Sequence, residues 1–167
     1  MTEPDGEPLP TLEGRALTFG LALAATQILD PSHATLAPEH ARRHLFAGLD
    51  ATLAARLQPG DIVVASEVHG TEAFAHHVVA TLAAAGIVAL VAERFAPTIL
   101  ASAIAAGVVA ITTDTPSFLR TSDRVRLDLD AGKIVNLSSG DRAAIRNAST
   151  PRDRATLRTT LARSPVP

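Results

Sequence analysis

The sequence predicts an α/β fold with a parallel βαβαβ core and an added C-terminal antiparallel hairpin. The first observation is a set of three short apolar runs without polar alternation, which is typical of strands covered on both faces. They are residues 61–65, 87–92 and 108–111. The second is a helical pattern between each run and the next, so the strands should be parallel with right-handed crossovers. The third is a late pair of alternating segments, which predicts the hairpin.

The segment before this core is expected to hold one strand and two short helices. Residues 15–23 are moderately apolar and predict a strand that leads into a loop at Thr26–Pro31. A helix should begin at residues 35–39, because proline is tolerated in a first turn, and should carry Leu45 inward. Asp50 is then expected to cap a second short helix, which ends at a Pro-Gly pair.

The two crossover helices are predicted from the spacing of their apolar residues. They span residues 71–85 and 97–106, and a glycine follows each of them, as is common where a helix ends. The inward-facing residues should be Phe74, Val78 and Leu82 in the first helix, and Ile99, Ala103 and Ala106 in the second. Helices at these positions would cover one face of the parallel strands.

The hairpin is predicted from residues that alternate with period two. Residues 125–129 and 133–137 flank the turn Asp130-Ala131-Gly132. Alternation of this kind is typical of an antiparallel sheet that is buried on one face only.

Composition limits the function before any motif is considered. The 167 residues suit one domain, and 47% hydrophobic content allows a buried core. A net charge of −2 argues against a globally basic nucleic-acid binder, and five Phe with no Trp or Tyr offer little base stacking. The apolar run 87–92 is too short to cross a membrane, and the acidic, Pro-rich start does not fit a secretory signal, so we expect a cytoplasmic protein. No Gly-x-Gly-x-x-Gly or Walker-type phosphate loop occurs.

The chain is expected to divide into one domain with two loose ends. Residues 1–12 are rich in proline and acids and predict a flexible N-terminal arm, and residues 13–148 form the domain. Residues 149–167 predict a flexible basic tail, and the overlapping stretch from Arg142 to Arg163 has six arginines against one acid. Contact of this tail with RNA or an acidic partner remains an alternative to a solvated tail.

Several short motifs occur in an order that resembles a known family. They include Pro59-Gly60-Asp61-Ile62-Val63-Val64-Ala65, the Gly70 turn, Ala84-Ala85-Gly86-Ile87, Ala92-Glu93-Arg94-Phe95-Ala96 and the late Ile134-Val135-Asn136-Leu137. From about Gly14 to Leu137 the chain resembles the small subunit of 3-isopropylmalate dehydratase, which is similar to the swivelling domain of aconitase. The resemblance implies a swivelling β/β/α domain built on the predicted core.

The resemblance also implies a function. It predicts a hydro-lyase subunit of leucine biosynthesis that closes over a large subunit and isomerises a 2-hydroxy di- or tricarboxylate by dehydration and rehydration. A four-iron four-sulfur cluster is expected in the large subunit and no cofactor in this chain, which agrees with the absence of cysteine. The expected partners are that subunit and a small hydroxy-acid, with neither nucleic acid nor membrane. A homo-oligomer of the chain alone, and a non-catalytic scaffold or regulatory paralogue, remain alternatives.

Residues matched to the family motifs define the candidate substrate-binding site. The resemblance assigns Thr26, His33, Gly70 and His77 to it, and Thr71 is added because the Gly70-Thr71 pair is expected to end a strand, cap a helix and offer amides to an anion. The family's Ser-Ser-Arg is replaced here by Ala73, Phe74 and Ala75, its Thr-Asp by Thr26-Gln27, the loop arginine by His33, its Phe-Ala-Arg by Phe95-Ala96-Pro97 and a later Asn by Ser102. Because planar arginines suit carboxylates, these replacements leave no residue that we assign as catalytic.

The histidines suggest two further hypotheses. His69, Glu72 and His76 have a spacing that would suit a metal, although a helix-capping Glu72 and a solvated His76 are the simpler interpretation, and no metal ligand is assigned. His40 and His44 are expected on an exposed polar helix face. His76 and His77 point about 100° apart on a helix and make a poor acid–base pair.

Overall fold

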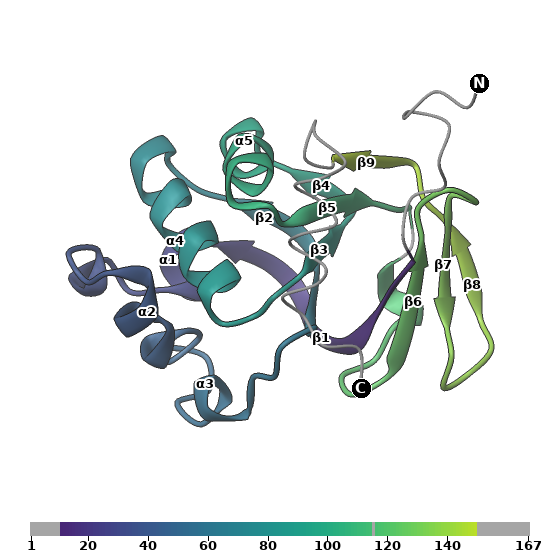
Figure 1. Ribbon diagram of the computed structural model, residues 1–167, viewed down its shortest axis with the longest axis horizontal. Coiled ribbons are helices and arrows are strands. Elements are labelled where there is room, and N and C mark those ends of the chain that lie inside the picture. The colour runs from purple at the N-terminus through teal and green to yellow at the C-terminus, as the bar shows by residue number, and fades with distance from the viewer. Residues whose placement is uncertain (1–10, 115, 150–167) are drawn as a thin grey trace, which may run out of the picture.

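A parallel sheet lies between a layer of helices and a small antiparallel sheet (Figure 1). The computed structural model describes residues 11–114 and 116–149, apart from the side chains of Leu21 and Glu72. Its central strands lie in the order β1-β2-β3-β5, and neighbouring strands are parallel. They are β1 (Leu12–Ala24), β2 (Ile62–His69), β3 (Ala89–Ala92) and β5 (Val109–Thr112). The predicted α/β fold with a parallel βαβαβ core is confirmed.

The helices cover one face of this sheet (Figure 1). The two long helices, α4 (Glu72–Ala84) and α5 (Pro97–Ala106), are the predicted crossovers. Three short helices precede them: α1 (Ala25–Ile28), α2 (Pro38–Ala41) and α3 (Leu53–Arg56). Val78, Leu82, Ile99 and Ala103 are completely buried against the sheet, as their spacing predicted. Gly107 ends α5 in the left-handed conformation that favours glycine.

The antiparallel sheet covers the other face. It consists of β6 (Arg124–Asp128), β7 (Lys133–Asn136) and β8 (Arg142–Ala144), and β6 also pairs with the first residues of β1. Val125, Leu127 and Ile134 are fully buried between the two sheets. The predicted hairpin and the β/β/α layering are therefore confirmed.

Three short strands and two strand ends were not predicted. β4 (Arg94–Phe95) pairs with β2, β8 pairs antiparallel with β7, and β9 (Asn147–Ser149) pairs antiparallel with β5. Leu12, assigned to the arm, begins β1 and is 4% exposed in the core between the sheets. Ser149, assigned to the tail, pairs with Ala110. The remainder of the arm except Thr11, and the rest of the tail, lie outside the described residues.

The segment between β1 and β2 differs most from prediction. The expected loop at Thr26–Pro31 begins as the helical turn α1, because the Gln27 side chain accepts a hydrogen bond from the Ala24 amide at 2.9 Å and stabilises the turn. The next helix stops after one turn and continues as a 3₁₀ turn at Arg42–His44. Leu45 is buried as expected. Asp50 binds the amide and hydroxyl of Thr52 rather than capping a longer helix.

Candidate functional site

The carboxyl ends of β1 and β2 bring the predicted ligand residues to one edge of the sheet. Ala24 pairs with His69 in the parallel ladder, so the residues that follow the two strands meet there. A Cβ atom added to Gly70 would lie 2.6 Å from the Ala25 Cβ. Thr26 follows Ala25 and Thr71 follows Gly70, and both threonines are exposed. Thr26 and Gly70, which were assigned to one candidate site, therefore lie at the same edge of the sheet.

A second element fixes the Gly70 turn from the other side. The Thr98 hydroxyl donates a hydrogen bond to the Gly70 carbonyl at 2.8 Å, and the Ala96 amide donates to the Val68 carbonyl at 2.9 Å. Both donors lie at the start of α5. The turn is thus held between α1 and α5, and little freedom remains for its backbone.

We expect Gly70→Ala to lower the free energy of unfolding by about 1–3 kcal/mol, because the new methyl group must displace Ala25. The matched test places the same substitution in an Ala25→Gly background, where the opposing methyl group is absent. Urea unfolding of the four chains should show a clearly smaller loss from Gly70→Ala in that background. Equal losses in both backgrounds would show that the contact with α1 does not fix the turn.

The start of α4 presents hydrogen-bond donors at this edge. Thr71 is the N-cap residue, with extended backbone and no side-chain capping bond. The first amides of a helix lack partners within the helix and carry partial positive charge. With the exposed Thr71 hydroxyl, this arrangement suits an anionic oxygen.

His33 and His77 meet behind this edge. The Nε2 atom of His77 lies 3.2 Å from the His33 carbonyl oxygen, which links α4 to the 3₁₀ turn Pro31–His33. The His33 ring stacks on His44, with centroids 3.8 Å apart and planes 6° apart. The Ser32 amide, which donates to Asp30 at 2.9 Å, holds the pKa of that carboxyl below its usual value. The two histidines of the predicted site thus hold the segment that carries Thr26.

An ion pair beside this edge was not predicted from the sequence. Arg94 of β4 pairs with Glu67 of β2, with Nη2 and Oε2 3.4 Å apart. The only sequence signal was an arginine directly before the Phe-Ala pair of a quoted motif. The residue that Arg94 meets across the strands depends on the register of β4 against β2, which the sequence does not show.

The metal hypothesis remains a prediction. Among the side chains that the structure describes, no group of three or more His, Cys, Asp or Glu is placed to hold a metal ion. The hypothesis includes Glu72, whose side chain lies outside that description, while His69 and His76 are exposed. His40 is exposed as predicted, but His44 is half-buried because it stacks on His33.

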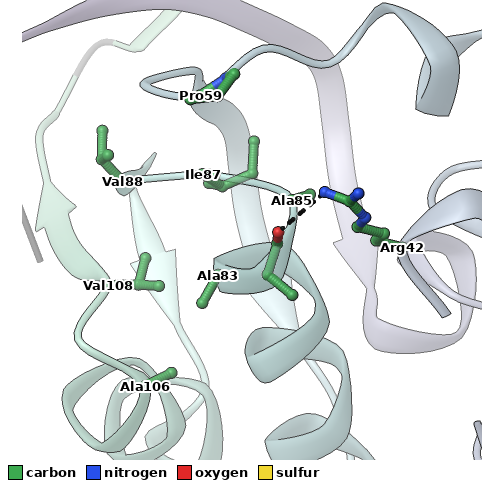
Figure 2. A pocket seen from close by; sticks show the side chains of 10 residues that line it. Arg42, Pro59, Ala83, Ala85, Ile87, Val88, Ala106 and Val108 are labelled. Carbon is green, nitrogen blue, oxygen red and sulfur yellow. Dashed lines mark hydrogen bonds between the residues drawn. The ribbon is translucent and has the colours of Figure 1, made fainter. Parts of the chain in front are cut away.

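A cavity of about 340 Å³ lies near the amino ends of the parallel strands, away from the Gly70 turn. Figure 2 shows it between the ends of α4 and α5, where the Arg42 guanidinium donates to the Ala84 carbonyl at 3.5 Å. A cation at a helix carboxyl end is favourable for the helix dipole. The position of Arg42 is therefore explained by its contact with the carboxyl end of α4.

Within the described residues, no helix has the length and apolar character needed to span a bilayer.

Known proteins resemble the chain along most of its length. It is 30% identical over 132 residues to the 3-isopropylmalate dehydratase small subunit of Moorella thermoacetica, covering 78% of this chain and 80% of that protein. The chain belongs to the 3-isopropylmalate dehydratase small-subunit family. A small subunit from Archaeoglobus fulgidus is 28% identical, with 77% of this chain and 80% of that protein covered. No protein-family model matches the chain.

Solved structures support the same family fold. The 3-isopropylmalate dehydratase structure from Methanocaldococcus jannaschii superimposes with a TM-score of 0.74 and 25% identity, covering 94% of this chain and 91% of that one. Aconitase X from Thermococcus kodakaraensis shares the fold with a TM-score of 0.52 and 20% identity, covering 84% and 93%. The predicted swivel-domain architecture is confirmed.

Proposed function

We propose that the chain is the small subunit of a hydro-lyase of the 3-isopropylmalate dehydratase type. It would close over a cluster-bearing large subunit during isomerisation of a 2-hydroxy di- or tricarboxylate by dehydration and rehydration. The observation that carries the proposal is the packing of the Gly70 turn on Ala25, which sets Thr26 and Thr71 at one open edge of the family fold. Such an enzyme would serve leucine biosynthesis in the cytoplasm.

In this proposal the chain binds and orients the substrate. The Gly70 turn is fixed against Ala25, and the Thr71 hydroxyl and first α4 amides that follow it receive a carboxylate. The Thr26 hydroxyl offers a further donor from α1. His33 and His77 keep the α1 segment in place through their 3.2 Å contact. We assign no proton transfer to this chain.

The iron–sulfur cluster does not fit this chain. Clusters are held mainly by cysteine thiolates, and the sequence contains none. The cluster therefore belongs to the proposed large subunit.

A specific observation favours a second candidate, a non-catalytic scaffold or regulatory paralogue. Ala73, Phe74 and Ala75 stand where the family has two serines and an arginine. Ala75 is completely buried, so this position offers neither a donor nor a charge to a ligand. A chain that keeps the fold while losing these groups could retain its partner without turnover.

The test is co-expression with an iron–sulfur large subunit under anaerobic conditions. We expect a stable complex that converts 2-isopropylmalate or a related hydroxy-acid, followed by the absorbance of the unsaturated intermediate. Thr71→Val should reduce kcat/KM roughly tenfold or more, because a hydrogen bond to a charged group is lost. Thr35→Val, at an exposed threonine of the preceding segment, is the matched control. A complex without turnover would favour the paralogue, and no complex would contradict the proposed subunit role.

A further inference from the structure

A substrate with two or more carboxylates needs a cation that the expected positions do not supply. The residues that match family arginines are His33, Ala75 and Pro97. Ala75 is buried, Pro97 begins α5, and the His33 ring stacks on His44. Carboxylates are bound best by a guanidinium, which offers paired donors in a plane. A replacement cation must therefore come from another arginine near the Gly70 turn.

Arg94 lies beside this turn on a strand that is tied to it. In the β2–β4 ladder, Arg94 pairs with Glu67 and Phe95 with Val68. Glu67 precedes Gly70 by three residues, a span of about 10 Å along an extended strand. β4 leads directly into the start of α5 (Figure 1), whose Thr98 hydroxyl binds the Gly70 carbonyl. The position of Arg94 relative to the turn is thus fixed by backbone contacts.

The side chain of Arg94 is available to a ligand. Val68 is buried in the core on the helix side, and Phe95 packs against that core. Glu67 and Arg94, the preceding residues of the two strands, point the other way because side chains alternate along a strand. The Arg94 side chain is 71% exposed. His69, two residues beyond Glu67, is also exposed.

The bond that now holds Arg94 is a weak one. The 3.4 Å separation from Glu67 exceeds the 2.7–2.9 Å that is usual for a charge-assisted bond. Among the ion pairs of the described residues, this is the longest. Arg146, another arginine near the carboxyl ends of the strands, is held by Asp114 and by the Glu93 carbonyl. Arg94 can therefore exchange Glu67 for a ligand carboxylate more readily than Arg146 can leave its partners.

We propose that Arg94 binds one carboxylate of the substrate while the Gly70–Thr71 turn binds another, and that Glu67 holds the guanidinium when substrate is absent. The inference rests on the proposed function. It assigns carboxylate recognition to β4 in place of the arginines missing from α4 and α5.

The test is a titration of the full chain with 2-isopropylmalate, followed by the amide shifts of Gly70 and Thr71 in ¹H–¹⁵N NMR. Arg94→Gln should weaken binding roughly tenfold or more, because a bond between two charged groups is lost. Glu67→Gln should strengthen binding, because the competing carboxylate is removed. Arg126→Gln, at an arginine paired with Glu13 in the antiparallel sheet, is the control and should leave binding unchanged.

The same variants are assayed in the complex with the large subunit. Arg94→Gln should raise KM roughly tenfold while kcat stays within a few-fold, and its melting temperature should equal that of the wild type. Unchanged affinity and unchanged KM in Arg94→Gln would overturn the inference even if the wild-type complex is active. An inactive wild-type complex would refute the proposed function, whereas the NMR titration would still decide Arg94. Absence of both binding and turnover in the wild type would overturn the two together.

Discussion

Phe46→Ala is expected to destabilise the chain by about 3–5 kcal/mol, the range for removing a large aromatic side chain from a packed core. Phe46 is fully buried, and its ring stacks on Phe19 with centroids 4.7 Å apart. Its amide donates to the Ile28 carbonyl at 2.6 Å, which closes the segment that contains α1 and α2. Guanidinium unfolding followed by circular dichroism measures the loss.

The backbone at Phe46 allows a sharper comparison. Its φ of 61° lies in the left-handed region, which is strained for a bulky residue and unstrained for glycine. Glycine ordinarily destabilises a chain relative to alanine, but here Phe46→Gly should be more stable than Phe46→Ala by about 1 kcal/mol, because the strain is released. The reverse order, or a loss below about 1 kcal/mol in both variants, would contradict the role assigned to Phe46.

Loss of the Phe46 side chain should loosen mainly the segment that carries Thr26. Ile28, which accepts the Phe46 amide, ends α1 two residues after Thr26. Hydrogen exchange in Phe46→Ala should therefore accelerate first in the segment from α1 to the Arg42–His44 turn. The amides of α5, on the other side of the Gly70 turn, should keep their protection longer.

Local signals explain why the core was predictable. Helix α5 spans Pro97–Ala106 as predicted, since a proline suits its first turn and Gly107 ends it. The buried strands were recognisable because both of their faces are covered, which requires uninterrupted apolar residues. Parallel order then follows from the crossovers, whereas the assignment of Thr26 and Gly70 to one site followed from the family resemblance.

The remaining features depend on contacts that are distant in sequence. The α1 turn requires the Gln27 side chain to reach the Ala24 amide, and its closure requires Phe46 in a conformation that phenylalanine rarely adopts. β4 has two residues and exists only because β2 lies beside it. The Arg94–Glu67 pair follows from that register. No pattern in the sequence reports on such register, so this part of the site required the structure.

The second large effect concerns the junction of the two sheets, where Gly14 is irreplaceable. Gly14 pairs with Val125 of the antiparallel sheet, and two residues later Ala16 pairs with Ile62 of the parallel one. A Cβ on Gly14 would lie 1.9 Å from the carbonyl oxygen of Gly60, a backbone atom that cannot rotate away. We expect Gly14→Ala to cost about 3 kcal/mol or more, because overpacking against backbone displaces a whole segment.

Displacement of the Gly60 loop is itself resisted, since the Gly60 amide donates to the Gly86 carbonyl at 2.8 Å. For a chain of this size, a loss of that magnitude lowers the melting temperature by about 6–12 °C. Gly20→Ala is the matched control: it lies in the same strand, and a Cβ there meets nothing within 4 Å. It should change stability by less than about 0.5 kcal/mol. Equal melting temperatures for the two variants would mean that the sheets do not depend on the close approach of Gly14 to Gly60, and that the β/β layer tolerates a wider junction than its packing implies.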